Sequence, residues 1–228
     1  MSAISLHGVS VSLGETTALD NITLELDART IAVVGDNGSG KSTLARVIGG
    51  LVPPTSGTVR VHGVDPVRQA RELRRLVAIV FSNPDAQIIM PTVREDVEFS
   101  LRTEKLPRDV VKARVDAALE EFGLTELASR SAHELSGGQK QLLALCGAFV
   151  RRPELVVADE PTALLDARNG RRVADHLLGG DDHRLVLVTH DLALAARCEA
   201  AVLVAGSRIA AAGGSDEVVA AYERSLVC

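Results

Sequence analysis

The sequence predicts an α/β fold with a mixed sheet core, an antiparallel β subdomain and an α-helical subdomain. A β-branched run at 30–34 is followed by a glycine-rich turn and by apolar residues at helical spacing, and helical signals dominate from 83 to about 150. Strand and helix patterns then alternate, which is typical of parallel strands joined by right-handed crossovers. These patterns are strands at 155–158, 184–189 and 201–205 and helices near 167–178 and 191–198.

The composition is typical of a globular protein with a sizeable core. The chain has 228 residues, of which 46% are hydrophobic and 24% are charged. We expect one domain over 1–228, in which 1–82 and 151–228 form the core and the antiparallel sheet. Residues 83–150 are expected to form the helical subdomain.

Charge and cysteine content restrict the possible partners and location. The net charge of −5 argues against a nucleic-acid surface. The cysteines (Cys146, Cys198 and Cys228) are few and unpaired in spacing, which indicates a reducing compartment. Residues 1–5 lack a signal-peptide pattern, and no apolar run approaches the ~20 residues of a membrane span. We therefore expect any membrane role to pass through a separate polypeptide.

Short strands are predicted in the first third of the chain. Alternating apolar residues at 4–13 and 22–26 predict half-exposed antiparallel strands, and 58–61 and 77–81 predict two further strands. The pair Asp65-Pro66 predicts a helix start, with the aspartate as cap and the proline as first helical residue.

The helical subdomain has local start and stop signals. Thr92 and Glu95 form a capping box that predicts a helix through about Leu101. The apolar residues of 111–122 predict a second helix, which Gly123 ends.

The strongest motif lies between the strand at 30–34 and the helix after it. It has the G-x-x-x-x-G-K-[ST] spacing, and we call it the phosphate loop: Gly35, Asp36, Asn37, Gly38, Ser39, Gly40, Lys41, Ser42 and Thr43. Its glycines let backbone N–H groups converge on one anion, and the helix N-terminus adds positive charge. Lys41 can reach the β- and γ-phosphates, and Ser42 can ligate Mg²⁺. A flexible loop with Ser42 as an ordinary cap is the alternative, but the flanking strand and helix favour a nucleotide-phosphate site.

An acidic pair follows the buried strand at 155–158. Asp159 and Glu160 are expected beyond the carboxyl end of that strand, where ligands bind in parallel sheets. Asp159 can hold Mg²⁺ through its shell, and Glu160 can polarise an attacking water. Acidic residues at strand ends are common, so this prediction depends on the phosphate loop.

The run Leu-Ser-Gly-Gly-Gln at 135–139 has two interpretations. Ser136 and Gln139 satisfy a capping box, so the run could simply begin a helix. Gly137 and Gly138, however, each cost about 1 kcal/mol relative to alanine in a helix. Bare backbone at a helix N-terminus is also what an approaching phosphate requires.

With these motifs in this order, nearly the whole chain resembles the ATP-binding-cassette (ABC) ATPases. Residues 135–139 resemble the family's signature segment, and 163–166 are similar to its D-loop. The resemblance implies that Glu160 is the general base and that His190 is a switch residue contacting the γ-phosphate. Judged from its neighbours alone, His190 could instead be a satisfied histidine at a strand end or beside a helix cap.

The resemblance also implies a dimer, because the chain carries one phosphate loop and one signature segment. Two chains would meet head to tail around two ATP molecules. The residues Ser136, Gly137, Gly138 and Gln139 of one chain would then complete the site of the other. Asp166 would lie at the contact between them.

A narrower resemblance covers 81–87 and 90–97. These residues are similar to ATPases of energy-coupling-factor (ECF) importers for vitamins and for cobalt or nickel ions, and the whole chain looks most like the biotin-importer type. The same residues would also suit a plain turn and capped helix. The implied partners are a second ATPase (a copy or a paralogue), a transmembrane scaffold contacted through 82–97, and a small substrate-binding membrane subunit. The expected place is peripheral, at the cytoplasmic face of the membrane, with no nucleic-acid partner.

Two positions depart from the family pattern. Ser82 stands where a glutamine usually reaches toward Mg²⁺, and its side chain is shorter by roughly 2.5 Å, so it would act through a bridging water or after loop movement. Gln87 is a poor substitute, because the subfamily already has a glutamine there. Leu13 stands where an aromatic often stacks on adenine, and it offers apolar contact without a π face. Both could equally be ordinary loop or core residues.

The sequence thus predicts an ATPase that drives a membrane importer by in-line attack of water on the γ-phosphate. One alternative is a soluble ABC ATPase acting on DNA or another macromolecular complex. The stretch between Lys41 and Ser136 is too short for the coiled coils of the DNA-acting class, and ribosome-acting relatives carry two cassettes. Another alternative is a weakly hydrolysing nucleotide-binding module, against which the intact Lys41, Asp159 and Glu160 argue.

Overall fold

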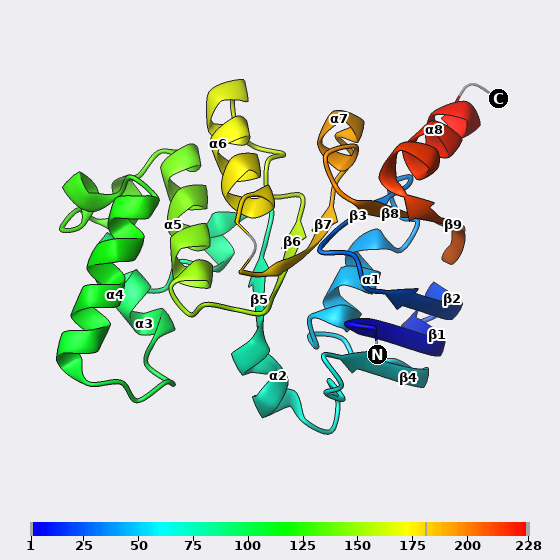
Figure 1. Cartoon of the computed structure of the whole chain (residues 1–228), viewed down its shortest axis with the longest axis horizontal. Helices are drawn as coiled ribbons and strands as arrows, with labels where there is room; N and C mark the ends of the chain where they lie inside the picture. The colour runs from blue at the N-terminus through cyan, green and yellow to red at the C-terminus, as the bar shows by residue number, and fades with distance from the viewer. Residues whose placement is uncertain (1, 181, 227–228) are drawn as a thin grey trace.

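A computed structural model describes residues 2–180 and 182–226 and places two sheets among the helices of this part of the chain (Figure 1). The antiparallel sheet has the order β2-β1-β4, with β1 (Ile4–Leu13), β2 (Thr16–Leu26) and β4 (Ser56–Val61). The larger sheet has the order β5-β6-β7-β3-β8-β9. It consists of β3 (Thr30–Val34), β5 (Val77–Val80), β6 (Leu155–Asp159), β7 (Arg184–Val188), β8 (Ala200–Ala205) and β9 (Arg208–Gly214). Its strands pair in parallel except for β8 and β9, which are antiparallel.

The helices connect and cover these strands. The α-helices are α1 (Lys41–Ile48), α2 (Ala70–Leu76), α3 (Val93–Ser100), α4 (Arg108–Glu121), α5 (Gly137–Phe149), α6 (Ala167–Leu178), α7 (Leu192–Ala195) and α8 (Ser215–Leu226). Short 3₁₀ turns are η1 (Pro84–Ala86), η2 (Thr125–Leu127) and η3 (Ala132–Glu134). The predicted α/β class with its antiparallel sheet and helical part is confirmed.

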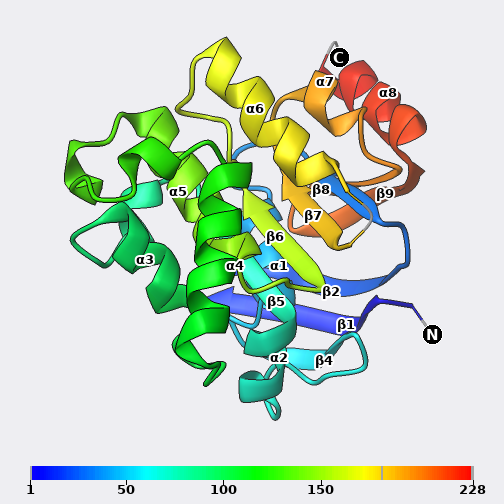
Figure 2. The same cartoon turned by 60° about the vertical axis from the view of Figure 1, so that its left-hand side comes forward.

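Each face of the larger sheet is buried in a different core. In β3, Ile31 and Val33 pack with α1 and the antiparallel sheet, whereas Ala32 and Val34 pack with α3 to α8. The other central strands alternate in the same way, as expected for a parallel sheet covered on both faces. Helix α1 therefore lies between the two sheets, and helix α5 packs on the opposite face of the larger one (Figures 1 and 2).

The local capping signals are confirmed. Thr92 Oγ1 accepts a hydrogen bond from the Glu95 N–H, and Glu95 Oε2 accepts one from the Thr92 N–H at 3.1 Å. Gly123 follows α4 with a φ of 65°, as expected for a helix stop. Helix α5 belongs to the predicted helical subdomain, but it also packs on the larger sheet. Its apolar side chains share one buried cluster with strands β5, β6 and β7.

Three local predictions were wrong or incomplete. Asp65 Oδ1 does accept hydrogen bonds from the N–H groups of Val67 (3.0 Å) and Arg68 (3.1 Å), but these close a turn, and α2 begins only at Ala70. Strand β2 begins before the predicted 22–26. Strand β9 and helix α8 were not predicted. The Ala- and Gly-rich residues of β9 carry little apolar alternation.

Two further observations concern the membrane and the thiols. Among the helices that the structure describes, none has both the length and the apolar character needed to cross a membrane. Cys146 and Cys198 are free and buried, and Cys228 lies outside the described residues.

Candidate functional site

Residues 35–40 form a tight turn from β3 into α1. Gly35 and Gly40 have φ values of 139° and 110°, which favour glycine. A Cβ would lie 2.1 Å from the Val204 carbonyl oxygen at Gly35 and 2.4 Å from the Ala18 carbonyl oxygen at Gly40. The backbone of the phosphate loop is therefore pressed against β8 on one side and β2 on the other.

Unpaired donors gather at the start of α1. Gly40 is the N-cap residue, and no side chain among the described residues caps this helix. The Ser39 hydroxyl is buried without a partner in that same part of the chain, and Thr43 in the first turn is half-buried. Asp36, Asn37 and Gly38 form the exposed rim of the loop. Open N–H groups and an orphaned buried hydroxyl fit the phosphate groups of a nucleotide.

Lys41 is held over this turn. It is only 7% exposed, and its Nζ donates hydrogen bonds to the carbonyl oxygens of Gly35 and Asp36, both at 2.7 Å. Burial lowers the pKa of Lys41, and the carboxylates of Glu160, Asp36 and Asp159 oppose that shift. The ammonium group is therefore placed inside the loop and in the field of the acidic pair.

The two oxygen donors predicted for Mg²⁺ are adjacent. The Ser42 hydroxyl donates to Asp159 Oδ1 at 2.9 Å, and Asp159 is buried at the end of β6. The Arg46 guanidinium lies 4.0 Å from Asp159 Oδ2. A hydroxyl and a carboxylate are ligands that Mg²⁺ prefers, so the residues present fit this ion.

Glu160 and His190 meet at the ends of neighbouring strands. His190 Nδ1 lies 2.8 Å from Glu160 Oε2, and the Glu160 N–H donates to the Val188 carbonyl oxygen at 2.9 Å. Glu160 has a φ of 50°, a left-handed conformation that costs about 1 kcal/mol or more in a non-glycine residue and is common at functional sites. His190 itself is 67% exposed in its side chain. The pair thus presents an oriented carboxylate whose charge acts on Lys41, with the imidazole open to solvent.

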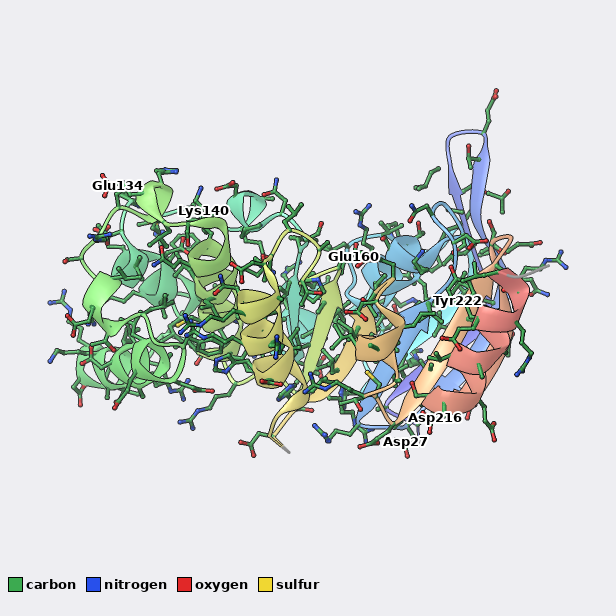
Figure 3. The ribbon with its side chains drawn as sticks, turned by 90° about the horizontal axis from the view of Figure 1, so that it is seen from above. Asp27, Glu134, Lys140, Glu160, Asp216 and Tyr222 are labelled. Carbon is green, nitrogen blue, oxygen red and sulfur yellow. The ribbon has the colours of Figure 1, made fainter. Side chains whose placement is uncertain are left out.

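The signature segment lies elsewhere. The Ser136 N–H donates to Gln139 Oε1 at 2.9 Å and Ser136 Oγ accepts from the Gln139 N–H, so the predicted capping box is confirmed. In the view from above, Lys140 of α5 and Tyr222 of α8 lie on opposite sides of Glu160 (Figure 3). No hydrogen bond or ion pair between described residues joins 136–139 to the phosphate loop. One chain therefore does not bring the two motifs together.

Asp166 and Gly138 are connected within the chain. Asp166 caps α6 by accepting hydrogen bonds from the N–H groups of Asn169 (2.9 Å) and Arg168 (3.0 Å). The bonds from Asn169, the larger cause, and from Arg168 lower the pKa of Asp166. The Asn169 side-chain amide also donates to Asp166 Oδ2 at 2.8 Å and packs against Gly138. The D-loop residue and the signature segment thus share one neighbour, whereas Gly137 has open space beside it.

The two departures from the family pattern have clear environments. Ser82 is half-buried beside a cavity of about 140 Å³, and no hydrogen bond between described residues joins it to Ser42 or Asp159. Gln87 is committed elsewhere, because its amide accepts from the Phe81 N–H and donates to the Ile79 carbonyl oxygen. Leu13 is 52% exposed at the end of β1, in the hairpin whose second strand abuts the phosphate loop.

Some residues around the site were not predicted. The Tyr222 hydroxyl donates to Asp36 Oδ1 at 2.9 Å across a separation of 186 residues, and Lys140 pairs with Asp85 at 2.7 Å. Asn169 is a third example. These residues belong to no recognisable sequence motif, so only the three-dimensional structure could show that they lie near the site.

Comparison with known proteins shows the family to which the chain is similar. The family model described as ABC transporter matches residues 19–163. A putative ABC transporter ATP-binding protein of Deinococcus radiodurans is 43% identical and covers 98% of each chain. The biotin transport ATP-binding protein BioM of Rhizobium etli is 38% identical over 96% of this chain and 97% of its own length. The energy-coupling factor transporter ATP-binding protein EcfA1 of Bacillus subtilis is 36% identical over 90% of this chain and 74% of its own.

Solved structures are similar over the same span. The cbiO1 protein of Clostridium perfringens, described as part of the ABC transporter complex cbiONQ, has a TM-score of 0.86 at 30% identity, covering 98% of this chain and 92% of that one. A dimeric ATP-binding cassette in a post-hydrolysis state, bound to ADP and Pi, has a TM-score of 0.81 at 26% identity, covering 93% of this chain and 98% of that one.

Proposed function

Because this chain belongs to the ABC transporter family of ATP-binding proteins, we propose that it hydrolyses ATP to energise an importer in the membrane. The observation that carries the proposal is the 2.9 Å hydrogen bond between Ser42 and Asp159. It brings the phosphate loop onto the acidic end of β6, so that one site can bind phosphate groups and a cation together.

The metal part of this site is assigned by donor chemistry. Ser42 and Asp159 would hold Mg²⁺, with Ser82 contributing at most through a water. The ion would supply charge neutralisation at the β- and γ-phosphates. Lys41 would bind the same phosphates with its ammonium group.

The catalytic roles follow from the Glu160–His190 pair. Glu160 is the proposed general base that polarises the attacking water, since its carboxylate is held by His190 and its charge acts on Lys41. His190 would orient that carboxylate and contact the γ-phosphate. This assignment is supported by the 2.8 Å contact between the two side chains.

A second ATPase subunit would complete the site. Helices α1 and α5 pack on opposite faces of the larger sheet, so residues 136–139 would serve the nucleotide of a partner, which is a copy or a paralogue. Gly137, with open space beside it, suits the approach of a phosphate, and Asp166 would lie near the contact. Leu13 would give the adenine an apolar contact.

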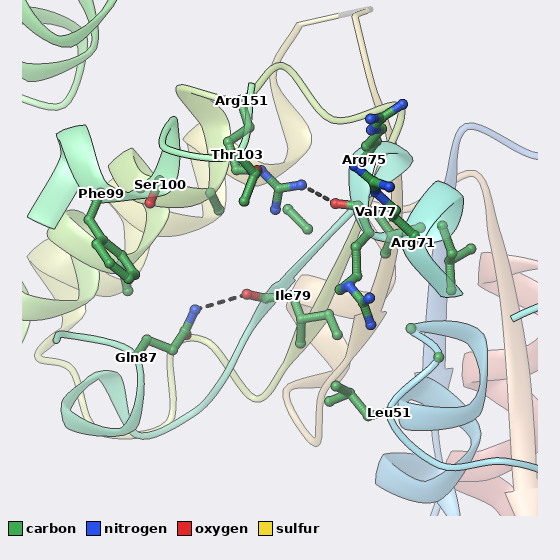
Figure 4. A pocket seen from close by; sticks show the side chains of 18 of the residues that line it. Leu51, Arg71, Arg75, Val77, Ile79, Gln87, Phe99, Ser100, Thr103 and Arg151 are labelled. Carbon is green, nitrogen blue, oxygen red and sulfur yellow. Dashed lines mark hydrogen bonds between the residues drawn. The ribbon is translucent and has the colours of Figure 1, made fainter. Parts of the chain in front are cut away.

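A cleft of about 750 Å³ between α2, α3 and α5 is the proposed contact with the transmembrane scaffold (Figure 4). Leu51, Ile89 and Phe99 expose apolar surface there, and Arg71 and Arg151 are among the basic residues that line it. It includes part of 82–97, and we treat 83–150 as the subdomain through which the stroke passes. An apolar cleft with a charged rim suits a short amphipathic helix.

The transported solute is proposed from the named relatives. One relative is a biotin transport protein, and others are energy-coupling factor transporter subunits. We therefore propose uptake of a vitamin, with biotin as first candidate, or of cobalt or nickel ions. The chain would be peripheral at the cytoplasmic face, beside the scaffold and a small substrate-binding subunit.

The test combines chemistry and transport. Purified protein with MgATP should release phosphate, and Lys41→Ala should abolish nucleotide binding. Cells lacking the chain should lose uptake of labelled biotin, cobalt or nickel, and Glu160→Gln should fail to restore it. Hydrolysis without any uptake defect would leave a soluble ATPase as the better description, and absence of MgATP binding would reject the whole proposal.

A further inference from the structure

The outer side of the phosphate loop is braced by the C-terminal part of the chain. The Ser207 N–H donates to the Ser39 carbonyl oxygen at 3.1 Å, and the Val204 carbonyl oxygen lies against Gly35. The Tyr222 hydroxyl donates to Asp36 Oδ1 at 2.9 Å. All three contacts come from 204–222, beyond the residues 19–163 that the family model matches.

Tyr222 is well placed to act as a fixed donor. It lies on α8, which packs on β8, β9 and β3, and its ring is half-buried against the core cluster on that face of the sheet. Burial, followed by the Asp36 carboxylate, raises the pKa of Tyr222, so the hydroxyl keeps its proton. The ring is therefore anchored on the core of the sheet, and its hydroxyl reaches the loop from there.

Asp36 is the residue through which the loop holds its lysine. Its carbonyl oxygen accepts hydrogen bonds from Lys41 Nζ at 2.7 Å and from the Ser39 N–H at 3.1 Å. Its carboxylate accepts the hydrogen bond that the Tyr222 hydroxyl donates. A displacement of Asp36 would consequently move the lysine and the turn together.

We propose that Tyr222 is a positioning residue, which holds Asp36 and thereby the phosphate loop and Lys41 in the shape that accepts the phosphates of ATP. Helix α8 then sets nucleotide affinity without touching the reacting atoms. A loop held in its binding shape loses less conformational entropy when the nucleotide binds. The effect belongs to the binding step, because no hydrogen bond between described residues joins Tyr222 to the proposed base. This inference rests on the proposed nucleotide site.

The experiment compares full-length Tyr222→Phe with the wild type. Phenylalanine keeps the packed ring and removes only the donor. The dissociation constant for MgATP and the KM should each rise about three- to tenfold, the order expected for the loss of one ordinary hydrogen bond at an exposed position. The kcat at saturating ATP and the thermal midpoint should stay within error. The matched control is Ser225→Ala, which removes a 2.6 Å hydrogen bond to the Tyr222 carbonyl oxygen on the same helix and should leave the KM unchanged.

A second variant separates positioning from packing. In an Asp36→Asn background the acceptor loses its charge, so adding Tyr222→Phe should change affinity less than twofold. An unchanged KM in Tyr222→Phe overturns the inference, as does a fall in kcat with a lower thermal midpoint. The same loss in both backgrounds also overturns it. If the wild type itself binds no MgATP, the proposed function is wrong. That result differs from wild-type binding with an unchanged KM in Tyr222→Phe, which overturns only the present inference.

Discussion

The side chain of Asn169 occupies the space that a Cβ on Gly138 would need, since such an atom would lie 2.7 Å from the Asn169 side-chain carbon and nitrogen. The same amide holds Asp166, so the glycine is required by packing inside the chain. The other glycine of the signature segment, Gly137, has open space at its Cβ position, with no described atom within 4 Å beyond its chain neighbours and its own helix backbone. Packing against Asn169 therefore accounts for the glycine at 138, whereas no such packing constraint accounts for the glycine at 137.

Gly138→Ala should displace Asn169, weaken its bond to Asp166 and lower the free energy of unfolding by about 1–2 kcal/mol. Removing the clash with Asn169→Ala should restore most of that stability. Gly137→Ala, in contrast, should leave stability equal or higher, because alanine is the better helix former by about 1 kcal/mol. Its ATPase activity should nevertheless fall if this backbone approaches a phosphate. Urea denaturation and phosphate release measure the two effects. Equal loss of stability in both variants would contradict the distinction.

Glu160→Gln should abolish turnover while preserving MgATP binding. Loss of a general base reduces rates by roughly 10²–10⁴-fold, and the amide keeps the size and backbone of the native residue. ATP held without hydrolysis should then trap a dimer, visible by size-exclusion chromatography with and without ATP. Turnover at the wild-type rate would remove Glu160 from the base role.

Ser82→Gln should release phosphate as fast as the wild type or faster. The serine borders a cavity of about 140 Å³, which gives the longer side chain room. The control is Gln87→Leu, which breaks the hydrogen bonds to Phe81 and Ile79 and should lower stability by about 1–3 kcal/mol through unpaired backbone groups. A sharp loss of activity in Ser82→Gln at unchanged stability would show that the serine has a role of its own.

The buried thiols should be inert in the folded protein. Burial raises the pKa of Cys146 to about 12 and that of Cys198 to about 11, so neither forms a thiolate at pH 8. In a Cys228→Ser variant, a thiol-reactive chromophore should detect no fast-reacting group until denaturant is added, and then two. A thiol that reacts within minutes under native conditions would contradict this burial.

Short sequence signals predicted the turns and helix ends that depend only on neighbouring residues. The glycine-rich turn, the capping boxes at Thr92 and Ser136 and the stop at Gly123 all depend on residues within one turn of each other, and the structure has each of them. Asp65 shows the limit of such signals, because the same side-chain acceptor closes a turn as readily as it begins a helix.

Long-range contacts could not be read from the sequence. Strand β9 pairs with β8 in an Ala- and Gly-rich sequence that has no clear period, and Tyr222 reaches Asp36 across 186 residues. The sequence suggested that a glycine stands at 138 because a phosphate approaches the backbone there. In the structure the side chain of Asn169 leaves no room for a Cβ at this position. Motif chemistry predicts which residues carry function, whereas contacts such as those of Tyr222 and Asn169 follow only from the packing of the fold.

The ion pair between Lys140 and Asp85 should couple the start of α5 to η1. Its atoms are 2.7 Å apart and Lys140 is largely buried, while Gln141 of the same helix donates to the Phe81 carbonyl oxygen at 3.2 Å. A double-mutant cycle with Lys140→Met and Asp85→Asn should give a coupling of about 0.5–1 kcal/mol in urea denaturation, decreasing with salt. The exposed pair Lys112–Asp116, at 3.9 Å, is the matched control and should give none. Additive effects at Lys140 and Asp85 would mean that the ion pair does not couple η1 to the helix.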